Sequence, residues 1–208
     1  GLVSVIEKAL LAFEKSLPSS AVTRFPVTTD VVTDPQAALA RLLSSPPDPQ
    51  VRAAFERLAD EERSAIRDYL QTNRKHLTEK YSLTMTPARI DITAGHYIRH
   101  ITDTGRAVRQ IKTYYDEIKN AELIFFKLHD INIVLEEDAI DLILEMLVES
   151  ALDVKGISAM LNSHFEHGLK LVREKTGRSR FFIPRNGVVD PEGFVRGLGE
   201  RTAGVEVL

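Results

Sequence analysis

The stretch Ile131-Asn132-Ile133-Val134-Leu135, with the residues that follow it, decides the fold of the C-terminal part of the chain. It predicts a short strand, because β-branched residues dominate it. Glu136-Glu137-Asp138 then predicts the start of a helix, since the helix dipole favours negative charge in the first turn. A second helix is expected from Asp153, a good N-cap, to Gly177, which is typical of the left-handed turn that closes a helix. Phe181-Phe182-Ile183 predicts a final short strand.

The N-terminal part predicts helices separated by strong breaks. Apolar residues at helical spacing predict an amphipathic helix over residues 2–16. Residues 21–34 are rich in Val, Thr and Phe, which suits an extended segment. Asp34-Pro35 predicts an N-cap followed by proline in the first turn of the next helix. The three prolines of Pro46-Pro47-Asp48-Pro49 interrupt any regular element at that point.

Long helices are expected in the middle of the chain. One is predicted from about Gln50 to Thr78, and two more over residues 89–102 and 105–128. Ser82-Leu83-Thr84-Met85-Thr86 alternates polar and apolar residues, so it predicts a short strand that Pro87 closes.

These expectations add up to a mainly α fold with a small β component, arranged as helical subdomains. We divide the chain into an N-terminal segment (residues 1–43), a helical insertion (44–119), a strand-and-helix subdomain (120–183) and a tail (184–208). The tail is rich in turn-forming residues after Pro184, and we expect it to be loosely structured.

Composition excludes several classes of protein. The chain has 208 residues, of which 43% are hydrophobic and 27% charged, and its net charge is -3. These values fit neither a disordered polyelectrolyte nor a protein that binds nucleic acid through bulk charge. The absence of cysteine excludes disulfides, thiolate zinc sites and cysteine nucleophiles.

The sequence does not predict a membrane protein. Its longest apolar run, Leu142–Val148, is interrupted by Glu145. The run falls far short of the roughly 20 residues that a membrane span needs. No signal-peptide pattern opens the chain. We therefore expect a cytoplasmic location and no membrane partner.

Motifs for catalysis are missing. No Gly-x-x-x-x-Gly-Lys loop is present, so this chain alone is not expected to hydrolyse nucleotides. His96 and His100, like His164 and His167, have the spacing of one helix face. Zinc needs a third protein ligand and usually a fourth, so we expect structural histidines and no metal site.

A group of basic residues near the last strand admits two interpretations. Arginine forks suit phosphate oxygens, so the group could form a phosphate-binding rim. A solvated face that flanks a strand is the favoured interpretation, and no nucleic-acid signature accompanies the group. Its members are Arg173, Lys175, Arg178, Arg180 and Arg185.

Two stretches of the chain resemble the Clp/Hsl-type AAA+ ATPases, which unfold protein substrates. The first consists of Arg24-Phe-Pro-Val, an extended run and the helix that begins at Asp34-Pro-Gln-Ala-Ala-Leu. It is similar to the end of the family's ATPase core. The second, residues 125–183, has the order helix, strand, helix, helix and strand, and it resembles the family's small C-terminal lid. Together the two stretches cover roughly residues 18–43 and 120–183.

The resemblance implies roles for two residues. Arg24 matches the arginine that reaches the nucleotide of the neighbouring subunit and stabilises charge on the transferred phosphoryl group. Thr23 stands where the family has glycine. Lys155 matches the lid arginine that senses the γ-phosphate within the same subunit. As a lysine, it offers a point charge in place of a bidentate fork.

The resemblance also implies cofactors and partners. The parent protein would use ATP with Mg²⁺, associate with itself in a ring and act on a protein substrate or adaptor. Its nucleotide-binding half would precede Gly1, so this chain alone would hold no cofactor and would not be catalytic.

Three functions stay open on the sequence. The first is the lid and oligomerisation region of an AAA+ ATPase. The second is a stand-alone helical module for protein–protein interaction. The third, a hydrolase that uses the histidine and carboxylate clusters, is the least favoured.

Overall fold

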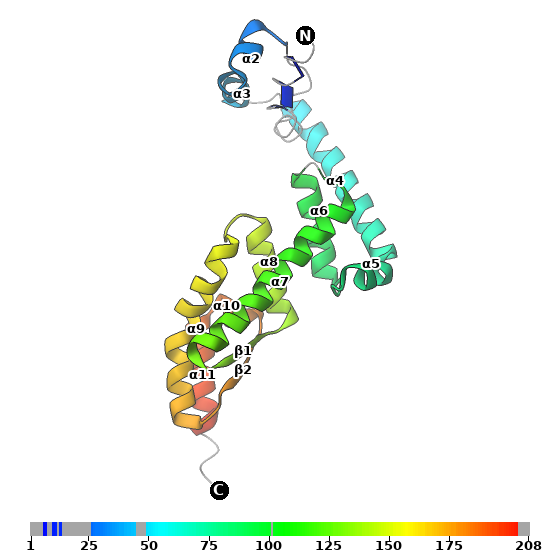
Figure 1. Cartoon of the computed structure of the whole chain (residues 1–208). Helices are drawn as coiled ribbons and strands as arrows, with labels where there is room; N and C mark the ends of the chain where they lie inside the picture. The colour runs from blue at the N-terminus through cyan, green and yellow to red at the C-terminus, as the bar shows by residue number, and fades with distance from the viewer. Residues whose placement is uncertain are drawn as a thin grey trace. The chain divides into compact units, whose positions relative to one another are not determined.

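The structure of the chain is a computed structural model that describes residues 6–7, 10–11, 13, 26–44, 49–100 and 102–203. It is mainly helical with one small sheet, which confirms the expected fold class. The elements are α2 (Thr29–Thr33), α3 (Pro35–Ser44), α4 (Pro49–Thr72), α5 (Arg74–Tyr81), α6 (Pro87–Arg99), α7 (Thr104–His129), β1 (Asn132–Leu135), α8 (Glu137–Val148), α9 (Val154–Thr176), β2 (Arg180–Ile183), α10 (Arg185–Val189) and α11 (Pro191–Ala203) (Figure 1).

The chain divides into two compact units. Unit 1 comprises residues 1–73 and 94–104, and unit 2 comprises residues 74–93 and 105–208, within the described ranges. The expected insertion, residues 44–119, is therefore shared between the units, because α5, most of α7 and the first turns of α6 belong to unit 2.

In unit 1, a short helix replaces part of the expected extended segment. Residues 29–33 form α2, because Val31 is buried against Phe13 and Leu39 and this packing outweighs the β-propensity of the stretch. Asp34 then caps α3 as predicted, since its Oδ1 atom accepts a hydrogen bond from the Ala37 amide at 3.0 Å.

The long helix expected from Gln50 to Thr78 is divided in two. Its first part, α4, carries ion pairs one turn apart, such as Arg52 with Glu56. At the break, the Asn73 amide and side chain both donate to the Tyr69 carbonyl, at 3.0 Å and 2.8 Å. An asparagine side chain that bonds to the backbone in this way competes with helix continuation, and α5 starts anew at residue 74.

Unit 2 is organised by a two-stranded parallel sheet. Both predicted strands form, and they pair with Ile133 opposite Phe181 and Leu135 opposite Ile183. These four side chains are buried, whereas Val134 and Phe182 point to the other face of the sheet. Parallel strands need a long connection, which α8 and α9 provide.

Two expectations about unit 2 are wrong. The first is the strand over residues 82–86, which have no regular structure. The alternation arises because Leu83 and Met85 are buried anchors of an irregular segment. The Met85 amide donates to Thr78 Oγ1, and the Arg89 amide donates to Thr86 Oγ1 at the start of α6.

The second correction concerns the tail after Pro184, which forms α10 and α11 up to residue 203. Helix α11 lies alongside α9 (Figure 1). The two helices approach closely because Gly168 has no side chain: a Cβ there would lie 2.5 Å from Val195 Cγ1. Phe194 also packs edge-on to Phe165, with 6.4 Å between ring centroids. Tertiary packing therefore orders a stretch that is rich in turn-forming residues.

Within the described residues, none of the helices combines the length and the apolar character that crossing a bilayer demands.

Candidate functional site

The start of α9 is shaped by Asp153 and Gly156. The Asp153 Oδ1 atom accepts a hydrogen bond from the Gly156 amide at 2.6 Å, which confirms the N-cap predicted from the sequence. A Cβ at residue 156 would lie 2.9 Å from Leu152 Cδ1 and 3.0 Å from the capping oxygen. Glycine at this position therefore lets the turn close around its cap.

Lys155 is exposed in the first turn of α9. No residue that the structure describes offers its ammonium group a hydrogen bond or an ion pair. A cation in this position opposes the helix dipole at a cost of about 0.3–1 kcal/mol. The first turn of α9 contains no acidic residue, and the capping carboxylate of Asp153 offsets part of the positive charge.

The positive end of a helix and a nearby ammonium both attract phosphate oxygens. Of the first-turn amides of α9, that of Gly156 already donates to the Asp153 carboxylate. Lys155 would supply a single, mobile point charge. Arg24, the other residue to which the resemblance assigns a role, lies outside the described residues, so the structure does not bring the two together.

The four arginines of the basic group near β2 each have a separate structural partner. Arg173 Nη1 donates to the carbonyls of His129 and Asp130, both at 3.1 Å, and so satisfies the C-terminal end of α7. Arg185 Nη2 lies 3.0 Å from Glu145 Oε2 on α8.

The remaining two arginines of the group lie along the sheet. Arg178 Nε donates to the Arg180 carbonyl at 2.8 Å and the guanidinium covers the Phe181 ring. Arg180 stacks on Phe182, with 5.0 Å from its guanidinium carbon to the ring centroid. Since the guanidinium groups have different partners, the geometry favours the solvated face over a phosphate-binding rim.

The first histidine pair is close in space. The rings of His96 and His100 have centroids 4.4 Å apart. The pKa of His96 is lowered to about 4, chiefly by burial and also by the nearby positive charges of His100 and Arg99. The buried Nδ1 atom of His96 has no hydrogen-bond partner among the residues that the structure describes. A metal-ligating histidine normally directs its second nitrogen to a partner, so this environment does not suit a ligand.

The two histidines of the second pair, His164 and His167, lie in different environments. His164 is partly buried, its ring lies edge-on to Phe165, and its Nδ1 atom also has no hydrogen-bond partner within the described ranges. His167 faces solvent. Over the described ranges, no three histidine, aspartate or glutamate side chains converge in a way that could hold a metal ion.

A buried charge cluster in unit 2 is a feature that the sequence analysis missed. Arg89 is fully buried, and its Nη2 atom pairs with Glu137 while its Nη1 atom donates to the Thr84 carbonyl at 2.9 Å. Its Nε atom lies 2.7 Å from Asp141 Oδ1, yet the two atoms make no hydrogen bond. At 2.7 Å, only an unfavourable N–H···O angle can prevent a hydrogen bond, so we describe the contact as an ion pair. Thr86 Oγ1 donates to the other Asp141 oxygen at 3.0 Å.

The cluster is structural, because a fully buried guanidinium cannot meet a ligand. One signal in the sequence points to it: Asp141 interrupts the apolar residues of α8. A buried carboxylate requires a partner, but nothing near Arg89 in the sequence marks it as that partner.

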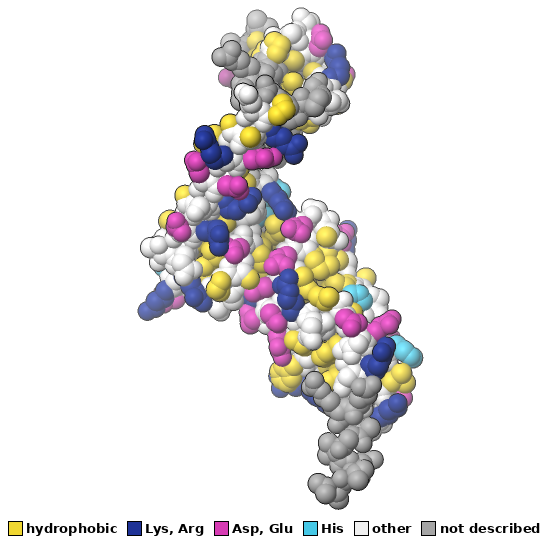
Figure 2. Space-filling model, turned by 180° about the vertical axis from the view of Figure 1, so that it is seen from behind, with side chains coloured by type: hydrophobic (Ala, Val, Ile, Leu, Met, Phe, Trp, Pro, Cys, Tyr) yellow, Lys and Arg dark blue, Asp and Glu magenta, His cyan; other side chains and the backbone are white. Residues whose placement is uncertain are grey.

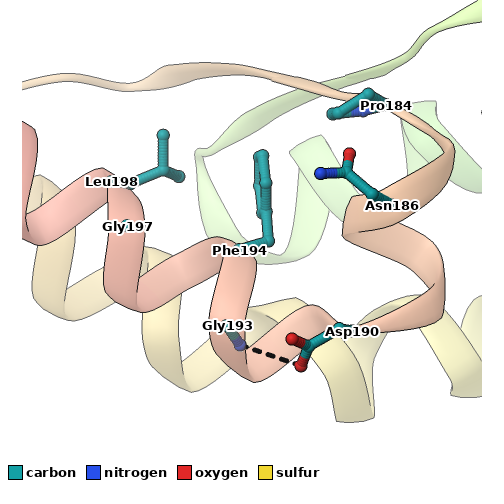
Figure 3. Close-up of a pocket in the computed structure, with 7 residues that line it drawn as sticks. All are labelled: Pro184, Asn186, Asp190, Gly193, Phe194, Gly197 and Leu198. Carbon is teal, nitrogen blue, oxygen red and sulfur yellow. Dashed lines mark hydrogen bonds between the residues drawn. The ribbon is translucent and has the colours of Figure 1, made fainter.

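A pocket of about 430 Å³ lies between α10 and α11. Figure 3 shows Phe194 and Leu198 directed from α11 toward the segment that carries Pro184 and Asn186. Asp190, the carboxylate among the described lining residues, accepts a hydrogen bond from the Gly193 amide at 3.0 Å and caps α11 (Figure 3). Among the lining residues that the structure describes there is no nucleophile–base pair and no cation, so these residues do not form a catalytic site. Its residues are Pro184, Asn186, Asp190, Gly193, Phe194, Gly197 and Leu198.

Surface charge does not favour a nucleic-acid partner on the face that Figure 2 draws. Lysine and arginine side chains alternate there with aspartate and glutamate side chains (Figure 2). A nucleic-acid interface would need a continuous basic stripe.

Comparisons with protein-family models, with curated proteins and with solved structures give no match to this chain.

Proposed function

We propose that this chain is the C-terminal lid and oligomerisation region of a Clp/Hsl-type AAA+ ATPase, which uses ATP and Mg²⁺ to remodel proteins. The observation that carries the proposal is Lys155. It lies at the start of α9, exposed and without a partner among the described residues, within a strand–helix–helix–strand unit of the kind that the resemblance implies.

The chemistry assigned to Lys155 is electrostatic. An ammonium group at a helix N-terminus adds to the positive end of the dipole, so both would attract the γ-phosphate of ATP bound to the parent's core. The lid would then report the phosphate's presence, because the loss of that charge on hydrolysis removes the attraction. The chain has no phosphate-cradling loop, so the catalytic site would lie in the preceding half of the parent protein.

Partners follow from the same proposal. The parent would assemble into a ring in the cytoplasm, in which Arg24 of one subunit stabilises phosphoryl transfer at the next. A protein substrate or an adaptor would be the object of the remodelling.

A direct test uses the parent protein with its upstream sequence. The coding sequence before Gly1 should contain a glycine-rich Lys-Ser or Lys-Thr loop. In that protein, Arg24→Ala should abolish ATP turnover and leave nucleotide binding nearly intact. Unchanged turnover would overturn the role of Arg24, and a start codon directly before Leu2 would overturn the whole assignment.

A second function, a stand-alone helical module for protein–protein interaction, is favoured by one observation. Several large apolar side chains of α7 are exposed, and they are not needed for a phosphate-sensing role. They are Leu123, Ile124, Phe126 and Leu128.

A further inference from the structure

An apolar surface of unit 2 extends from α7 across one face of the two-stranded sheet. Leu123 and Phe126 of α7 are about one turn apart and remain 48% and 43% exposed. Both line a groove between α7 and β1, and Val134 lines the same groove from the strand. Phe182, the direct neighbour of Val134 across the sheet, is 46% exposed. We call these four residues the α7–sheet patch.

The groove gives the patch a concave centre. Apolar side chains that are scattered singly are normal on a protein surface, whereas a contiguous group of them is typical of a binding site. The groove has a volume of about 260 Å³, so it has room for an apolar side chain of a partner. Its lining residues are Lys119, Glu122, Leu123, Phe126, Asn132, Ile133 and Val134.

The backbone of β1 beside the groove is closed to a partner. Ile133 and Leu135 are buried, and the Leu135 amide already donates to Glu122 Oε1 at 2.8 Å. A partner must therefore bind through side chains and satisfy its own backbone hydrogen bonds. An amphipathic helix meets both conditions, because its backbone is bonded internally and its apolar side chains recur along one face.

Cations lie on two sides of the patch. Lys127 is exposed one turn after Leu123 on α7. Arg180 lies on the same face of β2 as Phe182, with 5.0 Å from its guanidinium carbon to the ring centroid. No carboxylate that the structure describes forms an ion pair with Lys127 or Arg180. Complementary charge on a partner would therefore be negative, on both margins of its apolar face.

The carboxylates near the patch have other partners. Glu122 lines the groove but is almost buried and pairs with Lys119. Asp130, which follows α7, is within 3.9 Å of Arg173 Nη1. Glu136 occupies the N-cap position of α8, where the helix dipole stabilises its charge. These carboxylates leave the two cations available to a partner.

We propose that the α7–sheet patch binds an amphipathic helix of a protein partner, with acidic residues on both margins of the helix's apolar face. One apolar side chain of that helix fills the groove beside Leu123 and Phe126, and another packs on Phe182. Lys127 and Arg180 attract the acidic margins. A second copy of this chain fits less well, because it would bring the same cations together, and a flat lipid surface would leave the groove unfilled.

The proposal depends on unit 2 alone and does not rest on the ATPase assignment. It would give the second function, a module for protein–protein interaction, a defined surface. The tests of Arg24 and of the upstream coding sequence do not involve the patch, so their failure and the failure of this proposal are separate results.

The first test measures binding of a fluorescent peptide to the full chain by anisotropy. The peptide Glu-Leu-Glu-Ala-Leu-Leu-Ala-Glu-Leu-Glu-Ala-Leu-Leu-Ala-Glu places leucine on one helix face and glutamate on both margins. Saturable binding is expected, and Leu123→Glu should weaken it about tenfold or more, because it removes apolar contact and repels the glutamates. Leu128→Glu is the matched control: Leu128 is 63% exposed on the same helix but does not line the groove, so affinity should stay unchanged.

Two further peptides test charge and helical form. A version with lysine at every glutamate should bind about tenfold more weakly or worse, because Lys127 and Arg180 repel it. A version with proline as its middle residue should lose affinity to a similar extent, because proline breaks the helix. On the protein, Lys127→Glu should weaken binding of the glutamate peptide about threefold or more. Lys75→Glu, which changes an exposed lysine of α5 outside the patch, should have no effect.

Several results would overturn the proposal. Among the peptides, they are no binding at millimolar concentration and equal binding of the lysine or the proline version. Among the variants, they are equal effects of Leu123→Glu and Leu128→Glu. A dimer in sedimentation that Leu123→Glu dissociates would assign the patch to a second copy. Binding to phosphatidylserine vesicles that Leu123→Glu abolishes would assign it to a membrane surface.

Discussion

The Arg89 guanidinium and the Asp141 carboxylate hold the first turns of α6 against α8, with 2.7 Å between Nε and Oδ1 and with side chains only 1% and 7% exposed. Such a pair has a particular energetic character. Its net contribution to folding is small, because desolvation opposes the attraction, but removing one partner leaves a buried charge uncompensated. Unit 2 therefore depends on both residues being present.

Removal of the arginine should destabilise unit 2 strongly. Arg89→Met leaves the Asp141 carboxylate buried without its cation, so the free energy of unfolding should fall by about 3–5 kcal/mol. Urea denaturation followed by circular dichroism measures this change. Arg63→Met, which removes the exposed pair with Asp60 on α4, is the control and should cost less than about 1 kcal/mol. Equal losses from the two substitutions would show that the buried pair has no special role.

The Arg89–Asp141 pair also predicts that the free energy of unfolding depends on pH. Burial raises the pKa of Asp141 above its ordinary value of 3.8, although Arg89 and Thr86 oppose the shift. The folded chain therefore holds this proton to higher pH than the unfolded chain does, and the contribution of Asp141 to stability falls as pH rises through that window. Without the Arg89 charge, the pKa of the buried Asp141 carboxyl rises further, so folded and unfolded chains differ in protonation over a wider pH range. The stability deficit of Arg89→Met should therefore shrink as pH falls from 7 to 4, and a deficit independent of pH would contradict the explanation.

His96 predicts a dependence of stability on pH that has the opposite sign. Its pKa is lowered from 6.5 to about 4, chiefly by burial, so the unfolded chain binds a proton between these values that the folded chain does not. Stability should fall as pH drops from 6.5 toward 4, by up to about tenfold in the unfolding constant per pH unit. His96→Gln should flatten this slope relative to the wild-type chain. His167→Gln, at an exposed position, should leave it intact.

The close approach of α9 and α11 predicts a steric effect. Gly168→Ala places a Cβ about where Val195 now packs, so the free energy of unfolding should fall by about 1–3 kcal/mol. Gly197→Ala is the control, because a Cβ there meets nothing within 4 Å, and it should be neutral or stabilising by up to about 1 kcal/mol. Val195→Ala should restore part of the loss when combined with Gly168→Ala. If the losses from Gly168→Ala and Val195→Ala simply add, the steric conflict is not between these two positions.

The sequence predicted the local elements of unit 2 well for physical reasons. The strands at 131–135 and 181–183, the acidic start of α8 and the Asp153 cap of α9 all depend on neighbouring residues. Short-range signals of this kind are visible in a linear chain.

Features that depend on distant contacts escaped prediction. The order of α11 requires Gly168 to meet Val195, and the anchoring of α6 requires Arg89 to meet Glu137 and Asp141. Neither contact gives rise to a pattern among neighbouring residues in the sequence. The alternation at 82–86 misled for a similar reason, because its two apolar residues are buried by tertiary packing and not by a sheet.

For the candidate site, Lys155 was singled out by the family resemblance and not by a pattern in the residues themselves. The N-cap placed it in the first turn of α9, and the structure adds that it is exposed without a partner among the described residues.

The most direct measurement of the central proposal is steady-state ATP turnover by the parent protein with substitutions at Lys155. Lys155→Ala should lower turnover about tenfold or more, the loss expected for one charge-assisted contact to phosphate, and Lys155→Arg should retain most of it. Lys175→Ala, which removes an exposed lysine at the other end of α9, should leave turnover unchanged. Equal turnover for Lys155→Ala and Lys175→Ala would contradict the assignment of Lys155 as a phosphate sensor.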